Sequence, residues 1–156
     1  IMYNVLKLPA VSRLVQVGIR DYCEEESNGM HRAMGRVKTF FDTDINEAIY
    51  SGKTWSIVCK EIIQELPELV YVSFDIDGLT PDHCPHTGTP VPGGLDFSQV
   101  KFLLKQLAIS GKKIIGFDLC EVSGKSEWDA IMGSRVLFEL CNWMAVSNKK
   151  LEFKKS

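Results

Sequence analysis

Two aspartates stand where an apolar run passes into a loop in VYVSFDIDGLTPDHCPHTGTPVPGG, Val70 to Gly94. In an extended strand, residues i and i+2 point to the same side, so the carboxylates of Asp75 and Asp77 can reach one point in space. Neighbouring carboxylates raise each other's pKa unless a cation lies between them. A divalent, oxygen-seeking metal such as magnesium or manganese would resolve that conflict. The alternative is that one aspartate caps a turn while the other faces water.

The loop that follows the aspartates is unusually stiff. Four of the six prolines of the chain fall between residues 79 and 94. Proline fixes φ and reduces the freedom of the unfolded chain, and long ordered loops without secondary structure are usually functional. A simple connector does not need this stiffening, so the loop strengthens the hypothesis of a site at the two aspartates.

The elements that would position this site read as alternating strands and helices. Four short apolar runs predict strands: Leu14–Ile19, Val37–Phe41, Val70–Asp75 and Ile114–Leu119. Runs of this kind are typical of strands covered on both faces, as in parallel sheets. Helical periodicity predicts three helices: 54–66, 96–111 and 126–144. The order indicates an α/β fold of three α/β/α layers around a mainly parallel sheet, in which ligands bind beyond the carboxyl ends of the strands.

Signals at the helix ends support these boundaries. Asp96 is suited to cap a helix, and Gln99 three residues later completes a capping-box pattern. Gly111 suits the left-handed position after that helix. Ser126 is the expected start of the last helix. Pro67 is expected to end the first predicted helix, 54–66.

Composition narrows the class of protein. A length of 156 residues suits a single domain, residues 1–156, and a net charge of −2 gives no sign of nucleic-acid binding. No run is long and apolar enough to predict a membrane span. The five cysteines are spread out with no C-x-x-C pair, which favours reduced thiols and a cytoplasmic protein.

One local motif offers a different chemistry. FDIDGLTPD is similar to the Asp-x-Asp-Gly-Thr nucleophile motif of haloacid-dehalogenase-like phosphatases, but Leu79 stands where that family has threonine. The motif also lies in the middle of the chain, whereas that family usually has it near the N-terminus. The phosphatase interpretation is therefore kept as a weaker alternative.

A longer match points elsewhere. SFDIDGLTPDHCPHTGTPVPGG resembles the signature of the ureohydrolases, the family of arginase, agmatinase and formiminoglutamase: a strand ending in Asp-x-Asp, then a loop ending Thr-Gly-Thr-Pro-x-x-Gly-Gly. VQVGIRD, residues 15–21, and GFDLCEV, residues 116–122, resemble two further strands of that family in the right order. The resemblance covers most of the chain from Leu14 onward and implies a partial arginase-like fold.

The resemblance also implies site roles. Ureohydrolases bind two manganese ions that activate a bridging water for attack on a guanidinium carbon. Asp75 and Asp77 match a pair of metal-ligating aspartates. Glu121 matches the glutamate that grips the guanidinium, Thr89 a threonine beside it, and Asp118 a carboxylate that orients ligands from behind. The implied reaction is hydrolysis of a guanidino or formimino C–N bond in a small cationic substrate, with release of urea or formamide.

Departures from the family pattern temper this expectation. The family's other metal ligands lie in an upstream half, in Gly-Gly-Asp-His and Asp-x-His-x-Asp segments that this sequence lacks. The three histidines, His31, His83 and His86, have other contexts. The chain is therefore expected to be the C-terminal portion of a larger arginase-like domain, inactive and incompletely metallated by itself. The alternative from another class is a non-catalytic α/β module or pseudoenzyme.

Substrate and assembly are less defined. Thr80 stands where the family usually has an acidic residue, and Cys23 lies near where arginases place an aspartate that reads the substrate's amino group, so arginine itself is disfavoured. His83 and His86 are interpreted as exposed loop histidines or, less favoured, as substrate-reading groups. The resemblance implies a homo-oligomer, a trimer or hexamer, for the full-length protein.

Overall fold

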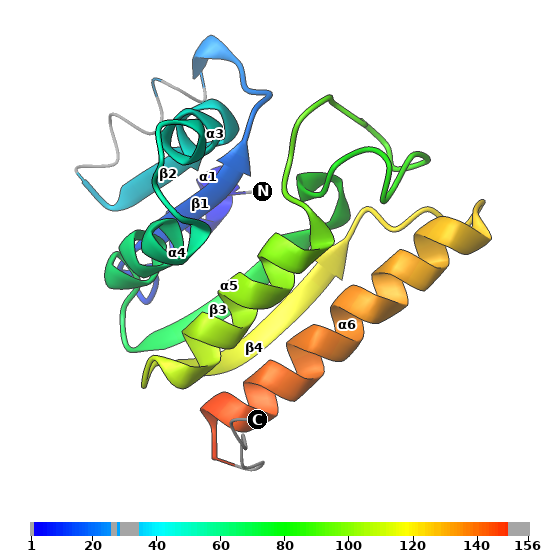
Figure 1. Ribbon diagram of the computed structural model, residues 1–156. Coiled ribbons are helices and arrows are strands. Elements are labelled where there is room, and N and C mark those ends of the chain that lie inside the picture. The colour runs from blue at the N-terminus through cyan, green and yellow to red at the C-terminus, as the bar shows by residue number, and fades with distance from the viewer. Residues whose placement is uncertain (1, 26–27, 29–34, 150–156) are drawn as a thin grey trace. The chain divides into compact units, whose positions relative to one another are not determined.

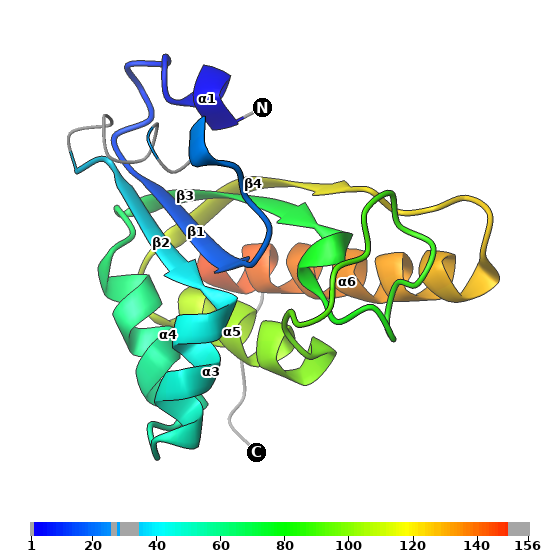
Figure 2. The ribbon, with the colours of Figure 1, turned by 90° about the horizontal axis from the view of Figure 1, so that it is seen from above.

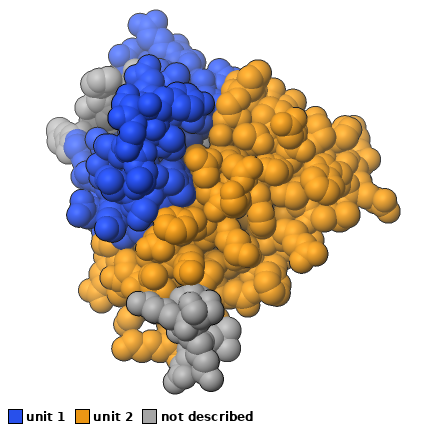
Figure 3. Space-filling view, viewed as in Figure 1, with its two compact units in different colours: residues 1–67 blue, residues 68–156 orange. Residues whose placement is uncertain are grey.

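The computed structural model describes residues 2–25, 28 and 35–149 and has an α/β architecture of parallel strand pairs and helices (Figure 1). The chain divides into two compact units, residues 1–67 and 68–156 (Figure 3). The α/β class and the parallel strands predicted from the sequence are confirmed. The parallel strands form two separate pairs, one in each unit. That residues 1–156 form a single domain stays a prediction.

Unit 1, residues 1–67, holds the first strand pair. Its described elements are α1 (Met2–Val5), β1 (Leu14–Ile19), β2 (Val37–Phe41), α3 (Asp42–Tyr50) and α4 (Trp55–Gln64). The strands have the predicted bounds and pair in parallel, with Leu14 opposite Val37. The sequence reading missed α1 and α3. The signals for α3 were present, because Asp42 and Asp44 place negative charge in its first turn.

Helix α4 supplies most of the buried apolar residues among the described part of unit 1. Its first residue is Trp55, and it ends at Gln64, three residues before Pro67. Val58 and Ile62, one helical turn apart, are 2% exposed, which confirms the predicted apolar face. The same unit contains an ion pair between Arg13 and Glu65.

Unit 2, residues 68–156, holds the second strand pair and the two longest helices. Its described elements are β3 (Leu69–Asp75), the short 3-10 turn η1 (Ile76–Gly78), α5 (Phe97–Ile109), β4 (Lys113–Cys120) and α6 (Glu127–Ser147). Strands β3 and β4 pair in parallel with Asp75 opposite Cys120. Helices α5 and α6 lie on the same side of this pair (Figure 2). Ile114 of β4 and Val136 and Leu140 of α6 are at most 1% exposed and form the centre of the packing.

The predicted capping signals of the helices in unit 2 are confirmed, although α6 runs three residues past its predicted end at 144. Asp96 and Gln99 form a complete capping box at the start of α5. Gly111 has a φ of 95°, the left-handed conformation expected after a helix. Ser126 is the N-cap of α6, and its side chain accepts a hydrogen bond from the Asp129 N–H. These local signals fix where α5 and α6 begin, and therefore where the preceding loops must end.

Two further features bear on the class of protein. In the part of the chain that the structure describes, no helix combines the length and apolar character that a membrane span requires. None of the five cysteines, all of which lie in the described residues, forms a disulfide; Cys59 and Cys84 are buried and the others are exposed.

Candidate active site

The predicted site residues gather where β3 and β4 end. The strands are parallel and in register, so Asp75 at the end of β3 lies opposite Cys120 at the end of β4. Asp77 follows Asp75 within η1, and Glu121 is the first residue after β4. Parallel strands end at the same edge of a sheet, where α/β proteins bind their ligands. The structure thus brings carboxylates from two distant segments to one edge of unit 2.

Asp75 is the carboxylate of this cluster whose pKa is raised. Its Oδ1 accepts a hydrogen bond of 3.1 Å from the Asp77 backbone N–H. Partial burial, followed by the negative charges of Asp77 and Glu121, raises the pKa of Asp75 to about 6. The backbone hydrogen bond acts in the opposite direction and only partly offsets these effects. Two carboxylates that disfavour the ionised form of a third in this way favour a bound cation, which would stabilise that ionised form.

Thr89 reaches this cluster from the loop between η1 and α5. Its hydroxyl donates a hydrogen bond of 3.3 Å to Asp77 Oδ2. The contact spans twelve positions of sequence and holds the far part of the loop against η1, directly after β3. Thr89 therefore lies beside one of the two predicted metal ligands, while its place next to a bound guanidinium stays a prediction.

Asp118 makes contacts of a different kind. Its Oδ1 accepts hydrogen bonds from the Ser73 hydroxyl at 2.9 Å and from the Cys120 thiol at 3.3 Å. Ser73 lies opposite Asp118 in the strand register. The hydrogen bond to Asp118 is the main cause of the raised pKa of Cys120, to which the charges of Asp75 and Glu121 add. That Asp118 orients metal ligands stays a prediction, because these partners are its strand neighbours.

Glu121 adopts an uncommon backbone conformation. Its φ of 61° is in the left-handed region, which L-residues other than asparagine and aspartate rarely occupy. A side-chain Cβ built on Gly88 would lie 2.9 Å from Glu121 Oε2, so the Glu121 carboxylate lies directly against the Gly88 backbone. Strained residues of this kind cluster at functional sites.

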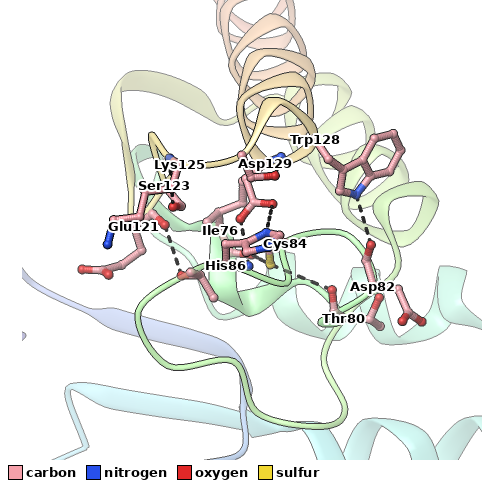
Figure 4. Close-up of polar contacts among 12 residues, drawn as sticks. Ile76, Thr80, Asp82, Cys84, His86, Glu121, Ser123, Lys125, Trp128 and Asp129 are labelled. Atoms are coloured by element: carbon pink, nitrogen blue, oxygen red, sulfur yellow. Dashed lines mark hydrogen bonds and ion pairs between the residues drawn. The ribbon is translucent and has the colours of Figure 1, made fainter.

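Sequence reasoning missed the contacts that anchor the loop to the helices (Figure 4). His86 contacts Asp129 of α6, and the Trp128 indole N–H donates 3.1 Å to the Asp82 carbonyl. His83 Nε2 lies 3.3 Å from Asp96 Oδ2 at the start of α5. The sequence offered only the unusual presence of two loop histidines as a signal, since nothing in it marks Asp129 as the neighbour of His86.

The histidines therefore have partners in the fold. His86 has an exposed side chain, as the favoured interpretation held, yet it is bonded to a buried carboxylate. His83 is less exposed, with 23% of its side chain accessible, and pairs with the capping aspartate of α5. His31 lies outside the described residues.

The residues present fit a divalent metal in part. Asp75 and Asp77 offer hard oxygen donors of the type that manganese and magnesium prefer, and burial together with the charges of Asp77 and Glu121 raises the pKa of Asp75. Within residues 2–25, 28 and 35–149, however, no group of three histidine, cysteine, aspartate or glutamate side chains is arranged to hold a metal ion. The two aspartates are suited to be part of a ligand set, which needs additional donors.

Comparison with known proteins decides the family. The family model described as "Arginase family" matches residues 1–142. The chain belongs to the arginase family. A guanidinobutyrase from Pseudomonas aeruginosa is 30% identical over 138 residues, covering 82% of this chain and 39% of that protein. An agmatinase from Pyrococcus horikoshii is 48% identical over 64 residues, covering 41% of this chain and 22% of that protein.

Solved structures of the arginase family have a similar fold. The proclavaminate amidino hydrolase of Streptomyces clavuligerus superposes with a TM-score of 0.70 at 28% identity, covering 88% of this chain and 44% of that chain. The arginase-family chain described here thus has a partial three-layer α/β/α fold, as the sequence predicted. It spans less than half the length of each of these relatives.

Proposed function

We propose that this arginase-family chain is part of a metal-dependent hydrolase that cleaves a guanidino or formimino C–N bond and releases urea or formamide. The observation that carries the proposal is the convergence of Asp75, Asp77 and Glu121, with Thr89 bonded to Asp77. Relatives named agmatinase and guanidinobutyrase support a guanidino substrate. A cluster of carboxylates also favours a cationic substrate electrostatically.

Each site residue has a defined task in this proposal. Asp75 and Asp77 would hold manganese, which, when bound, lowers the pKa of a coordinated water so that hydroxide is available near neutral pH. Glu121 would receive the guanidinium through a paired, charge-assisted contact. Thr89 holds Asp77 Oδ2 from the loop side and limits the positions this carboxylate can take. Asp118 would help to orient the metal ligands, because its hydrogen bonds to Ser73 and Cys120 hold the ends of β3 and β4 together.

The ligand set of this proposal needs donors beyond those described. We propose that two manganese ions per site are completed by residues of the longer natural protein, and that this chain by itself is inactive. The full-length protein is proposed to be a cytoplasmic homo-oligomer, a trimer or hexamer. These points rest on the family and on the short coverage of its relatives.

The experiment that tests the function measures manganese per chain, by elemental analysis after loading and dialysis, in the full-length protein. Close to two ions per chain, together with urea or formamide release from guanidino or formimino acids, is expected. Asp77→Asn is expected to lose at least one ion and most of the activity. Asp82→Asn is the matched control, because it makes the same charge change on an exposed loop residue whose carbonyl contact to Trp128 is preserved.

The alternative of a non-catalytic α/β module makes the opposite prediction. Full-length protein that retains no manganese and releases no product, while remaining folded, would overturn the proposed hydrolase and favour the module. The phosphatase alternative has lost its support, because the arginase family model matches residues 1–142.

A further inference from the structure

Four consecutive loop residues connect helix α6 to the candidate site; we name His86–Thr89 the HTGT segment. At its first residue, the His86 backbone N–H donates 3.0 Å to Asp129 Oδ2, and His86 Nδ1 lies 3.2 Å from Asp129 Oδ1. Both oxygens of one carboxylate are therefore bonded to one loop residue (Figure 4). A two-point contact of this kind fixes orientation as well as distance.

The remaining residues of the HTGT segment contact the site itself. The Thr87 hydroxyl donates 3.1 Å to the Glu121 carbonyl. Gly88 packs against the Glu121 carboxylate, with 2.9 Å between Oε2 and the position a Cβ would take. Thr89 donates to Asp77 Oδ2 at 3.3 Å. In sequence order, the segment therefore touches α6, the backbone of Glu121, the carboxylate of Glu121 and the carboxylate of Asp77.

Asp129 is a rigid point from which to hold this segment. It is 0% exposed and lies in the first turn of α6, where its backbone N–H donates to the Ser126 hydroxyl. Burial alone would raise the pKa of Asp129, but hydrogen bonds from His86 and Ser126 outweigh it and lower the pKa. Asp129 is thus held as a carboxylate whose partners are in place, which a buried charge requires.

We propose that Asp129 is a positioning residue of the site: by holding His86 at two atoms, it sets where the HTGT segment places the Glu121 carboxylate relative to Asp77. This inference rests on the proposed function, in which Glu121 receives the substrate and Asp77 a metal. Asp129 acts on both residues through the HTGT segment, whose hydrogen bonds run from Asp129 to the Glu121 carbonyl and the Asp77 carboxylate.

The physical argument concerns the backbone of Glu121 and the freedom of the loop. Glu121 has a φ of 61°, a conformation that costs free energy unless its surroundings hold it. The Thr87 hydroxyl provides one such restraint on the Glu121 carbonyl. If His86 is released from Asp129, Thr87 and Gly88 lose their fixed position and Glu121 loses its support. Displacements of about 1 Å at a catalytic group can reduce rates about 100-fold.

The first test is independent of activity and uses hydrogen exchange followed by mass spectrometry on this chain. Asp129→Ala is expected to increase exchange at least about tenfold in peptides covering residues 86–91, with β4 peptides changing less than about twofold. Glu127→Ala, which removes an exposed carboxylate from the same turn of α6, is the matched control and is expected to leave both regions unchanged. Unchanged exchange over 86–91 in a folded Asp129→Ala variant would overturn the proposal.

Removing a buried carboxylate can also unfold the chain, so a milder pair of variants is included. His86→Ala leaves Asp129 in place and removes only the imidazole contact, and it is expected to loosen residues 86–91 partially. His86→Asn keeps a side-chain N–H near the place of Nδ1 and is expected to restore protection. A merely structural role for the side chain would not predict rescue by asparagine, and equal exchange in the two variants would contradict the inference.

The second test is kinetic and uses the full-length, manganese-loaded protein. His86→Ala and Asp129→Asn are expected to lower kcat at least about tenfold with manganese content unchanged, and His86→Asn is expected to recover most of the loss. Full activity in His86→Ala and Asp129→Asn would overturn the positioning role while leaving the proposed hydrolase intact. Inactive wild-type protein would overturn the hydrolase, and the exchange experiment would still decide whether Asp129 fixes the HTGT segment.

Discussion

The two parallel strand pairs of this chain have similar hydrogen bonding but very different ends. In unit 1, β2 ends at Phe41 and α3 begins at the next residue, Asp42. In unit 2, β3 ends at Asp75 and α5 begins only at Phe97, with the loop and η1 between them. The direct strand-to-helix connection leaves no segment on which side chains could be arranged, whereas the long connection carries the HTGT segment to Asp77 and Glu121.

This difference indicates that the loop between η1 and α5 is an ordered element of unit 2, held in place by the helices. Both helices of unit 2 contribute an aspartate to it, because Asp96 of the α5 cap pairs with His83 and Asp129 of α6 pairs with His86. The two helices α3 and α4 of unit 1 have no side-chain cap. Anchoring at the starts of two helices explains how a long loop holds Thr89 beside a carboxylate.

The largest expected effect breaks the closure of this loop. Gly94 has a φ of 100°, and a Cβ there would lie 2.7 Å from the Leu79 backbone oxygen. Gly94→Ala is expected to lower the free energy of unfolding by about 2–5 kcal/mol, from backbone strain plus a clash that backbone cannot easily relieve. Urea unfolding of variant and wild type measures the change.

Unit 1 offers the matched control for that substitution. Gly52 has a φ of 96° but nothing within 4 Å of a built Cβ. Gly52→Ala is therefore expected to cost only the left-handed strain, about 1–2 kcal/mol. Equal losses for Gly52→Ala and Gly94→Ala would show that the packing of Gly94 against Leu79 contributes nothing.

A smaller effect tests the helix caps. Asp96→Ala removes the capping box of α5 and the partner of His83, and is expected to cost about 1 kcal/mol. Thr54→Ala at the start of α4 removes a side chain that makes no cap hydrogen bond and is expected to cost less than about 0.5 kcal/mol. Thermal or urea unfolding compares the two, and a larger loss for Thr54→Ala would refute the stated difference between the units.

A third substitution separates stability from function at Glu121. Glycine adopts the left-handed conformation without strain, so Glu121→Gly is expected to leave stability unchanged or raise it by up to about 1 kcal/mol. The same variant of the full-length protein is expected to lose hydrolase activity. Lys149→Gly, at the other non-glycine residue described with positive φ, 56°, is the control and should gain stability without loss of activity. Destabilisation by Glu121→Gly would mean that its carboxylate supports the fold.

The smallest expected effect is a pH dependence of the stability that Asp129 contributes. The pKa of Asp129 is lowered in the folded chain, so its ionised form contributes stability above the ordinary carboxylate pKa of about 3.9, and that stability is lost as pH falls through the folded value. Asp129→Asn cannot titrate. The difference in urea midpoint between wild type and Asp129→Asn is expected to be larger at pH about 6 than at pH about 3. A difference in urea midpoint that does not change with pH would contradict the lowered pKa of Asp129 in the folded chain.

Much of the fold followed from local patterns. β1 and β2 have the predicted bounds, and β3 and β4 extend only one residue beyond them at the ends that differ. These segments were predictable because short, β-branched apolar runs have few other stable environments. The α5 capping box was predictable because its hydrogen bonds join residues three positions apart. Helix α3 was missed because Asp42–Tyr50 is short and has few apolar residues, although its acidic first turn was a signal.

The sequence by itself determined which residues could do chemistry: Asp75 and Asp77 two positions apart at a strand end, and a proline-rich loop after them. Their periodicity is a property of the backbone, so it could be read without coordinates. Only the tertiary structure decided that Asp129 is buried against His86, that Gly88 lies against Glu121, and that Glu121 has a φ of 61°. These contacts join segments more than thirty residues apart, and burial and long-range hydrogen bonds leave no local mark in a sequence.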